Sequence, residues 1–346
     1  MRPVANQAGG LPVAARTQSQ ASRRAAQSEL TTVLAHYAAL IFGIICAAIG
    51  GEIFLRGAVG LARWSRISPG IIGATVAAFA TSGPELSVSI NSTLVGKPQI
   101  ALGDALGSNV VNVALILGAA LVISGIQSPR AGVKRDFPVA LLVPVIIGVL
   151  FVDGELSRVD GLLLLGAFVA WLVATIIEAR KQRSTTQGMA EEIRGAQRMW
   201  TVIIYCIIGL LFLVGAGRSI VMGARGIAVH FGIGEFVIGA TVVAVGTSIP
   251  ELATAIAAKL RGYDEVGLGT ILGSNIFNGL FIVALAAIIH PIAVGQREVF
   301  VALAFGFVAL ACSYPPGTGF IGRRRGVLLL AVYAVHVTTV LQTAAA

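Results

Sequence analysis

Two glutamates stand in apolar stretches beside proline and hydroxyl residues. Glu85 lies in AFATSGPELSVSI (78–90), and Glu251 lies in AVGTSIPELATAI (244–256). A buried carboxylate is costly unless it is paired or binds a cation. Two carboxylates side by side also repel each other, and a bound cation removes that repulsion. The two stretches therefore predict a cation site.

Neutral oxygen ligands accompany both glutamates. Proline lacks an N–H and clashes with the carbonyl one turn back, so each Pro-Glu should break its helix and free carbonyls near 78–81 and 244–247. Two GSN segments, 107–109 and 273–275, add serines, and an asparagine follows each. The candidate ligands are Glu85, Glu251, Thr81, Thr247, Ser82, Ser248, Ser108, Ser274, Asn112 and Asn278, with freed backbone carbonyls among 78–81 and 244–247. This oxygen-only set suits Ca²⁺ or Na⁺ and disfavours Zn²⁺, Cu and Ni.

The composition is that of a polytopic membrane protein. The 346 residues are 56% hydrophobic and 12% charged, whereas a soluble domain carries roughly 25% charged residues. The net charge of +9 is spread between apolar segments, which argues against nucleic-acid binding. Three cysteines show neither disulfide nor metal-site spacing. The lipid bilayer is thus the expected surrounding.

Ten apolar segments are candidate spans: 37–60, 70–95, 99–124, 137–152, 159–179, 199–221, 234–260, 265–289, 297–313 and 326–343. Residues 1–33 read as a disordered N-terminal tail, and 180–198 is a polar link. Loops on the side of this link hold 16 of the 25 Lys and Arg residues. The positive-inside rule then predicts a cytoplasmic link and both termini outside, most simply in the cell (inner) membrane.

An internal repeat relates the two halves of the chain. Segments 73–118 and 239–284 match at 21 of 46 positions without gaps, at a constant offset of 166 residues. Each half, 34–179 and 199–346, holds five predicted spans. Because five is odd, the second half should enter the membrane in the opposite orientation. The predicted fold is all-α, with ten transmembrane helices in two inverted five-helix repeats and broken helices 2 and 7 facing helices 3 and 8. Secondary transporters use this architecture.

The doubled motif, GATVVAVGTSIPEL with LGSNIFN, resembles the repeats of the cation/calcium exchanger superfamily, most closely the prokaryotic sodium/calcium exchangers. The resemblance spans about 34–346 and implies ten helices with a cytoplasmic link. It implies Ca²⁺ binding mainly by Glu85 and Glu251 with help from Thr81 and Thr247. It also implies Na⁺ binding at the positions of Ser82, Ser108, Ser248, Ser274 and the carbonyls of Ala78 and Ala244. Asn278 replaces an aspartate of some relatives, which argues against K⁺ co-transport.

The predicted function is secondary antiport of Ca²⁺ against Na⁺ by alternating access. Both ions are substrates; no cofactor is expected, and without a Walker motif no nucleotide is expected either. H⁺/Ca²⁺ antiport, exchange of another divalent cation and a passive Ca²⁺ channel remain alternatives. A serine hydrolase using Ser108 or Ser274 lacks a histidine base, so an enzyme is not expected. Oligomeric state is left open.

Several residues also allow a purely structural interpretation. Threonine and serine in membrane helices often bond their own backbone, and Asn112 and Asn278 could join helices. Asp104 is placed outside the core site, because Thr270 occupies the equivalent position of the second half. Glu52 and Arg218, also 166 residues apart, are expected to be solvated at an interface rather than paired. The four histidines are expected near span ends: His36, His230, His290 and His336.

Overall fold

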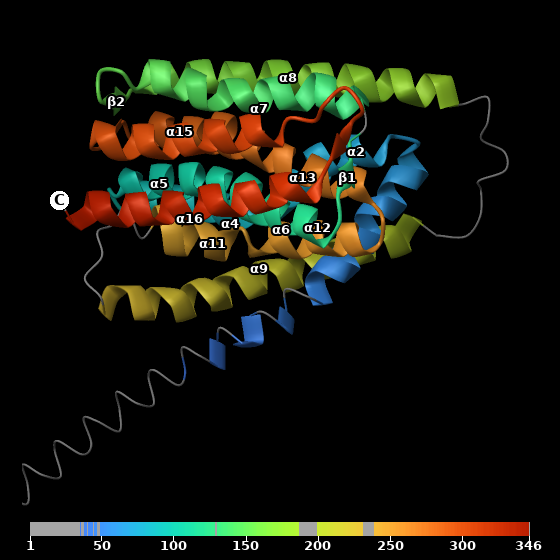
Figure 1. Ribbon diagram of the computed structural model, residues 1–346, viewed down its shortest axis with the longest axis horizontal. Coiled ribbons are helices and arrows are strands. Elements are labelled where there is room, and N and C mark those ends of the chain that lie inside the picture. The colour runs from blue at the N-terminus through green and yellow to red at the C-terminus, as the bar shows by residue number, and fades with distance from the viewer. Residues whose placement is uncertain are drawn as a thin grey trace, which may run out of the picture.

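The computed structural model describes residues 49–128, 130–186, 199–230 and 239–345, with a few positions between 35 and 46. The described chain is predominantly helical, and its long helices run alongside one another (Figure 1). The tail predicted at 1–33 lies outside the described residues, as does 187–198 of the predicted link. Residues 180–186 of that link continue a helix.

The first half begins with a helix at 49–65. Its remaining elements are α2 (Pro69–Ile72), the π-helix η1 (Gly73–Ala77), α3 (Ala78–Thr81), α4 (Gly83–Leu94), α5 (Pro98–Val110), the π-helix η2 (Val111–Leu117), α6 (Gly118–Ile123), β1 (Ile126–Gln127), α7 (Arg130–Leu150), β2 (Glu155–Leu156) and α8 (Arg158–Thr186). The second half comprises α9 (Met199–His230), the π-helix η4 (Gly239–Val243), α11 (Ala244–Thr247), α12 (Ile249–Leu260), α13 (Asp264–Ile276), the π-helix η5 (Phe277–Ile282), α14 (Val283–Ile289), β3 (Ile292–Ala293), α15 (Gln296–Ser313), β4 (Phe320–Ile321) and α16 (Arg323–Ala345).

The two halves share their local structure. Adding 166 to the bounds of η1, α3, α4 and α5 gives the bounds of η4, α11, α12 and α13. The turns after α4 and α12 correspond as well, since Gly96 and Gly262 adopt φ of 76° and 74°, a region that favours glycine. The short strands pair across the halves, β1 with β4 and β2 with β3, both antiparallel. The sequence repeat is thus also a repeat of elements.

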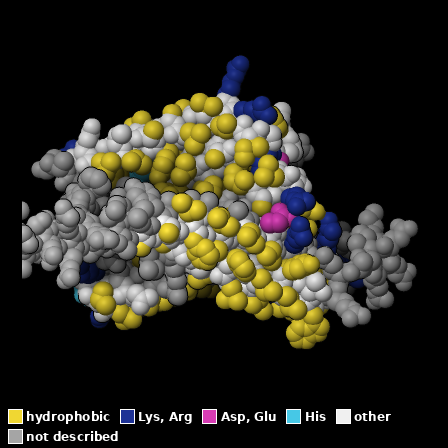
Figure 2. Space-filling model, turned by 90° about the horizontal axis from the view of Figure 1, so that it is seen from below, with side chains coloured by type: hydrophobic (Ala, Val, Ile, Leu, Met, Phe, Trp, Pro, Cys, Tyr) yellow, Lys and Arg dark blue, Asp and Glu magenta, His cyan; other side chains and the backbone are white. Residues whose placement is uncertain are grey.

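Six of the described helices are long and apolar enough to cross a membrane, or seven if the bent pair α2–α3 and α4 counts as one span. The six are Pro98–Ile123, Arg158–Lys181, Met199–Ala216, Asp264–Ile289, Gln296–Ser313 and Arg323–Gln342. Hydrophobic side chains cover much of the face in Figure 2, with few charged groups among them. The arrangement of ten spans stays a prediction.

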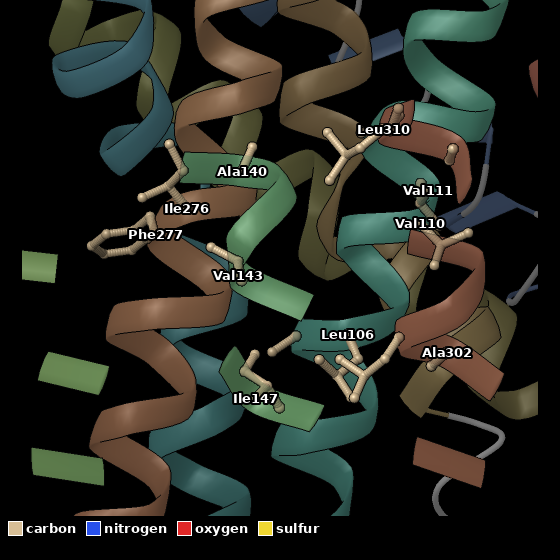
Figure 3. Packing of buried hydrophobic residues seen from close by; sticks show 14 of the residues in the cluster. Leu106, Val110, Val111, Ala140, Val143, Ile147, Ile276, Phe277, Ala302 and Leu310 are labelled. Carbon is tan, nitrogen blue, oxygen red and sulfur yellow. The ribbon is translucent and has the colours of Figure 1, made fainter. Parts of the chain in front are cut away.

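The centre of the bundle is built around α5 and α13. In an 18-residue stretch of each of the two spans that contain them, 78% and 83% of the residues are buried. Figure 3 shows Leu106 and Val110 of α5 packing in one cluster with Val143 of α7, Ala302 of α15 and Ile276 of α13. Helices α7 and α15 therefore cover the central pair, and α8 and α9 lie farther out in Figure 1.

Two glycines let the central helices touch the π-helices of the opposite half. A Cβ on Gly107 of α5 would lie 2.5 Å from the carbonyl oxygen of Ala240 in η4. A Cβ on Gly273 of α13 would lie 2.2 Å from the carbonyl oxygen of Ala74 in η1. The contact of Gly107 with Ala240 and the contact of Gly273 with Ala74 are equivalent, with the two halves of the chain exchanged. Each glycine places the serine that follows it, Ser108 or Ser274, against the other half.

Candidate ion-binding site

The helices that carry the two glutamates are broken as predicted. Helix α3 ends at Thr81 and α4 begins at Gly83, with a bend of 44° between α2–α3 and α4. The serine at each break, Ser82 or Ser248, has ψ near zero (12° and 6°). Glu85 and Glu251 then lie in the first turns of α4 and α12. A carboxylate is stabilised there by the free N–H groups of a helix N-terminus.

The prediction that each proline frees carbonyls across 78–81 and 244–247 is wrong at Ala78 and Ala244. The N–H of Ser82 donates to Ala78 O over 2.9 Å, and the N–H of Ser248 donates to Ala244 O over 3.1 Å. A proline removes only the donor for the carbonyl four residues earlier, and Pro84 follows Ala78 by six residues. Each alanine carbonyl keeps a second lone pair, so both can still contribute to binding a cation.

Serine hydroxyls connect each glutamate to the opposite half. The Ser82 hydroxyl donates to Glu251 Oε1 over 2.9 Å, and the Ser248 hydroxyl donates to Glu85 Oε1 over 3.3 Å. Ser274 of α13 also donates to Glu251 Oε1, over 3.1 Å. Both glutamates are 0% exposed. The structure thus brings the two predicted carboxylates to one buried place, where each bonds the serine at the other half's helix break.

The threonines are hydrogen-bonded to their own helices. Thr81 Oγ1 lies 3.0 Å from Ala77 O and 3.2 Å from Ala78 O, and Thr247 Oγ1 makes the equivalent contacts with Val243 and Ala244. This is the structural role that the sequence left open. Both side chains are nevertheless buried, and Thr81 lies near Glu251.

Asp104, placed outside the core site by sequence, lies within it. The side chain is 1% exposed, and its Oδ1 accepts a hydrogen bond of 3.0 Å from Thr247 Oγ1. Asp104 also lies close enough to Glu85 and Glu251 for the three charges to interact. The repeat concealed this residue, because its counterpart Thr270 carries no charge. A carboxylate one helical turn before Ser108 was the available signal.

The asparagines divide into two kinds. Asn112 donates to Asn275 Oδ1 over 3.1 Å, so it does join helices. Asn109 and Asn275 each donate to the other's backbone carbonyl, over 3.2 and 3.0 Å, a reciprocal pair that the sequence analysis missed. Asn278 differs: it is 0% exposed, and neither amide atom has a hydrogen-bond partner among the described residues. Its amide is available to an ion.

Negative charge at this site lacks a basic partner. Within the described part of the chain, none of the ion pairs involves Glu85, Glu251 or Asp104. Each of the three carboxylates keeps one buried oxygen that no described residue bonds. The described residues also contain no group of three His, Cys, Asp or Glu side chains arranged to hold one metal ion. A cation here must therefore be held by carboxylates together with hydroxyl, amide and carbonyl oxygens.

Two expectations away from the site need correction. Glu52 is not simply solvated: it pairs with Arg56 at 2.9 Å and with Arg261 at 2.6 Å. The side chain of Arg218 lies outside the described residues. His336 is fully buried against the ring of Phe305, because it points between α15 and α16 rather than to a membrane surface. His290 is exposed, whereas His36 and the side chain of His230 lie outside the described residues.

Comparison with known proteins identifies the family to which this chain belongs. Residues 35–177 and 201–342 match the model of the family described as sodium/calcium exchanger protein. The putative antiporter CaxA of Alkalimonas amylolytica is 35% identical over 303 residues, which cover 85% of this chain and 95% of CaxA. The sodium/calcium exchanger MaX1 of Methanosarcina acetivorans is 27% identical, covering 87% and 97%. The sodium-calcium exchanger NCX_Mj soaked with 100 mM Na⁺ and 10 mM Sr²⁺ has a TM-score of 0.75 at 30% identity, covering 88% and 98%. The chain therefore belongs to the sodium/calcium exchanger family, whose members are membrane transporters.

Proposed function

We propose that this protein is a secondary antiporter that exchanges Ca²⁺ for Na⁺ by alternating access. The observation that carries the proposal is the buried pair of glutamates, each bonded by the serine of the other half. The hydrogen bonds from Ser82 to Glu251 and from Ser248 to Glu85 bring two negative charges together, and no basic residue in the described part of the chain pairs with either. Ca²⁺ prefers such hard oxygen ligands.

Charge neutralisation explains how one site can couple two fluxes. Buried charges carry a large desolvation penalty, so an empty site with two negative charges resists occlusion inside the protein. One Ca²⁺ or several Na⁺ ions neutralise Glu85 and Glu251 and lower this barrier. The site then crosses between the two sides only when it is loaded. Coupling of this kind requires neither nucleotide nor cofactor, and the two ions are substrates.

The proposed architecture is ten transmembrane helices in two inverted five-helix repeats. Its support is the recurrence of elements at an offset of 166 residues and the contacts that recur with the halves exchanged, as at Gly107 and Gly273. Five spans in each half would give the halves opposite orientations. We place the protein in the cell (inner) membrane with the 180–198 link in the cytoplasm and both termini outside, on the distribution of Lys and Arg.

The experiment is ⁴⁵Ca²⁺ uptake into proteoliposomes that contain the purified protein. One set of vesicles is loaded with Na⁺ and diluted into Na⁺-free buffer, a second receives only a pH gradient, and a third receives neither. The double variant Glu85→Gln/Glu251→Gln serves as the control for carrier-independent leak. We expect uptake in the first set alone, and none with the double variant.

The other outcomes each point to a different mechanism. Uptake driven only by the pH gradient would replace Na⁺ by H⁺ as the counter-ion, since protons can neutralise the same carboxylates. Equal uptake in all three sets would indicate a passive Ca²⁺ pathway. Uptake by the double variant equal to that of the wild type would remove the two glutamates from the transport site.

A further inference from the structure

A groove runs between the last two helices, α15 and α16, which lie side by side (Figure 1). Its volume is about 330 Å³, and every residue that lines it is apolar: Ala304, Phe305 and Val308 of α15, and Leu328, Ala331, Val332 and Val335 of α16. Alanines on both walls, Ala304 and Ala331, leave the space open. The Phe305 ring packs on the buried ring of His336, with 5.1 Å between their centroids, and this contact fixes one wall. The groove offers van der Waals contacts to a hydrocarbon chain and no hydrogen bond to a polar ligand.

The two helices that form the groove lie at the periphery of the bundle. The chain belongs to a family of membrane transporters, and both helices are long and apolar enough to cross a membrane. In an 18-residue stretch of each, only 39% and 22% of the residues are buried. Val308, Leu328 and Val335 on the rim of the groove are about half exposed. Their surroundings in a bilayer are acyl chains, so an acyl chain is the molecule that meets this groove.

Three arginines begin α16, at 323–325. Arg323 donates to Ile123 O over 2.9 Å, and Arg325 donates to Tyr314 O. Arg324 is exposed, and its side chain forms neither a hydrogen bond nor an ion pair with any of the described residues. A guanidinium presents a planar fork of N–H donors that fits two oxygens of a phosphate. The Arg324 guanidinium is thus available to an anionic group.

Arg324 lies on the same face of α16 as the groove. Leu328, Ala331 and Val335 follow it by four, seven and eleven residues, which is the spacing of one helix face. At 1.5 Å per residue, these three lie about 6 to about 16 Å along the helix axis from Arg324. One leaflet contributes about 15 Å of the hydrocarbon core, so the groove covers the depth of one leaflet. Tyr314, at the end of α15 beside the arginines, is an aromatic residue of the kind found at headgroup level.

We propose that the α15–α16 groove and Arg324 form a binding site for one anionic phospholipid. One acyl chain lies in the groove, and the phosphate meets the Arg324 guanidinium. The groove alone gives little selectivity, because a chain that enters it from the bilayer exchanges one hydrocarbon surrounding for another. The headgroup supplies the selectivity, since one basic residue at the membrane surface favours an anionic lipid by about five-fold. In the proposed topology this lipid belongs to the cytoplasmic leaflet, whose surface is negative.

The test for the headgroup contact measures lipid binding to the purified, delipidated protein by native mass spectrometry. Dioleoyl phosphatidylglycerol and dioleoyl phosphatidylcholine are compared, because their chains are identical and only their headgroups differ. Arg324→Gln removes the charge at the groove, and Arg324→Lys keeps it. Arg297→Gln is the matched control, because Arg297 is also exposed, lies at the other end of α15 and gives the same change in net charge. Glycerophosphoglycerol, the headgroup without chains, is added as a competitor.

The test for the chain contact fills the groove from one wall. Ala331→Leu adds a larger apolar side chain inside the lining. Ala334→Leu is the matched control, because Ala334 is an exposed alanine of α16 outside the lining. Light scattering of each variant records the oligomeric state.

We expect the wild type to bind phosphatidylglycerol about five-fold more tightly than phosphatidylcholine, and Arg324→Gln to bind the two lipids alike. Arg324→Lys and Arg297→Gln should keep the preference. Ala331→Leu should weaken the binding of both lipids at least about three-fold, because several van der Waals contacts of the chain are lost. Ala334→Leu should bind both lipids as the wild type does.

Four results would overturn the site. Equal binding of the two lipids by the wild type, or the same loss of preference in Arg297→Gln as in Arg324→Gln, would remove Arg324 as the headgroup contact. Unchanged lipid binding by Ala331→Leu would remove the groove as the chain contact. Displacement of phosphatidylglycerol by an equal concentration of glycerophosphoglycerol would make this a phosphate site without a chain. A dimer that dissociates in Ala331→Leu alone would assign the groove to a second copy of the chain.

Discussion

Replacing Gly273 by alanine tests how closely α13 must approach η1 for the ion ligands to meet. The new Cβ would lie 2.2 Å from Ala74 O and 2.6 Å from its carbonyl carbon. Both obstructing atoms are backbone, so the helices must separate by roughly 1 Å to restore a normal contact. Overpacking of this kind costs about 1–3 kcal/mol, which corresponds to a fall of about 1–4 °C in unfolding temperature for a chain of this length. The shift also moves Ser274, whose hydroxyl is 3.1 Å from Glu251.

The assay combines thermal unfolding in detergent with Na⁺-driven Ca²⁺ flux. Gly273→Ala should lower the unfolding temperature and weaken transport, and Gly107→Ala should do the same through Ala240. Gly83→Ala is the matched control, because none of the described atoms lies within 4 Å of the position that its Cβ would take. It should leave both measurements near those of the wild type. Wild-type behaviour of Gly273→Ala, or equal damage from Gly83→Ala, would refute the close-approach argument.

Three further predictions concern single positions. Glu85→Gln or Glu251→Gln should abolish Ca²⁺ exchange while unfolding stays cooperative, because burying a neutral amide costs less free energy than burying a charge. Near-normal Ca²⁺ flux in both variants would contradict this. Asn278→Ala should shift the Na⁺ dependence of Ca²⁺ flux more than its Ca²⁺ dependence, and Asn278→Asp should raise the apparent affinity for monovalent cations. If the wild type and both variants gave superimposable flux curves, Asn278 would be a packing residue. Gly262→Ala should lower stability by about 1 kcal/mol, measured by thermal unfolding, since its φ of 74° strains an alanine; an unchanged unfolding temperature would argue against that turn.

The repeat made the central part of the site predictable. Glu85 and Glu251 could be identified because proline and hydroxyl residues recur beside them at a fixed offset, and both broken helices follow from those prolines. The GSN motifs likewise indicated the close packing at Gly107 and Gly273. The repeat could not predict the hydrogen-bond partner of each hydroxyl. Whether Ser82 caps its own helix or bonds Glu251 depends on how the halves meet in space.

Residues that break the repeat, or that act through the backbone, were the ones that sequence analysis misplaced. Asp104 was set aside because its counterpart is neutral, yet its environment is made by α11 of the other half. His336 sits near the end of the chain, but the packing of α15 against α16 buries it. Tertiary contacts decide each of these cases.

Equilibrium binding of ⁴⁵Ca²⁺ to the purified protein, titrated with Na⁺, tests the central claim most directly, because it needs no gradient and no conformational cycle. Opposite unit charges 4 Å apart attract by about 4 kcal/mol at an effective dielectric constant of 20, so losing one glutamate should weaken Ca²⁺ binding at least about 1000-fold. We predict saturable Ca²⁺ binding that Na⁺ displaces in the wild type, and no measurable binding in either Glu85→Gln or Glu251→Gln. Ca²⁺ binding that is indifferent to Na⁺, or that persists in both variants, would contradict the account.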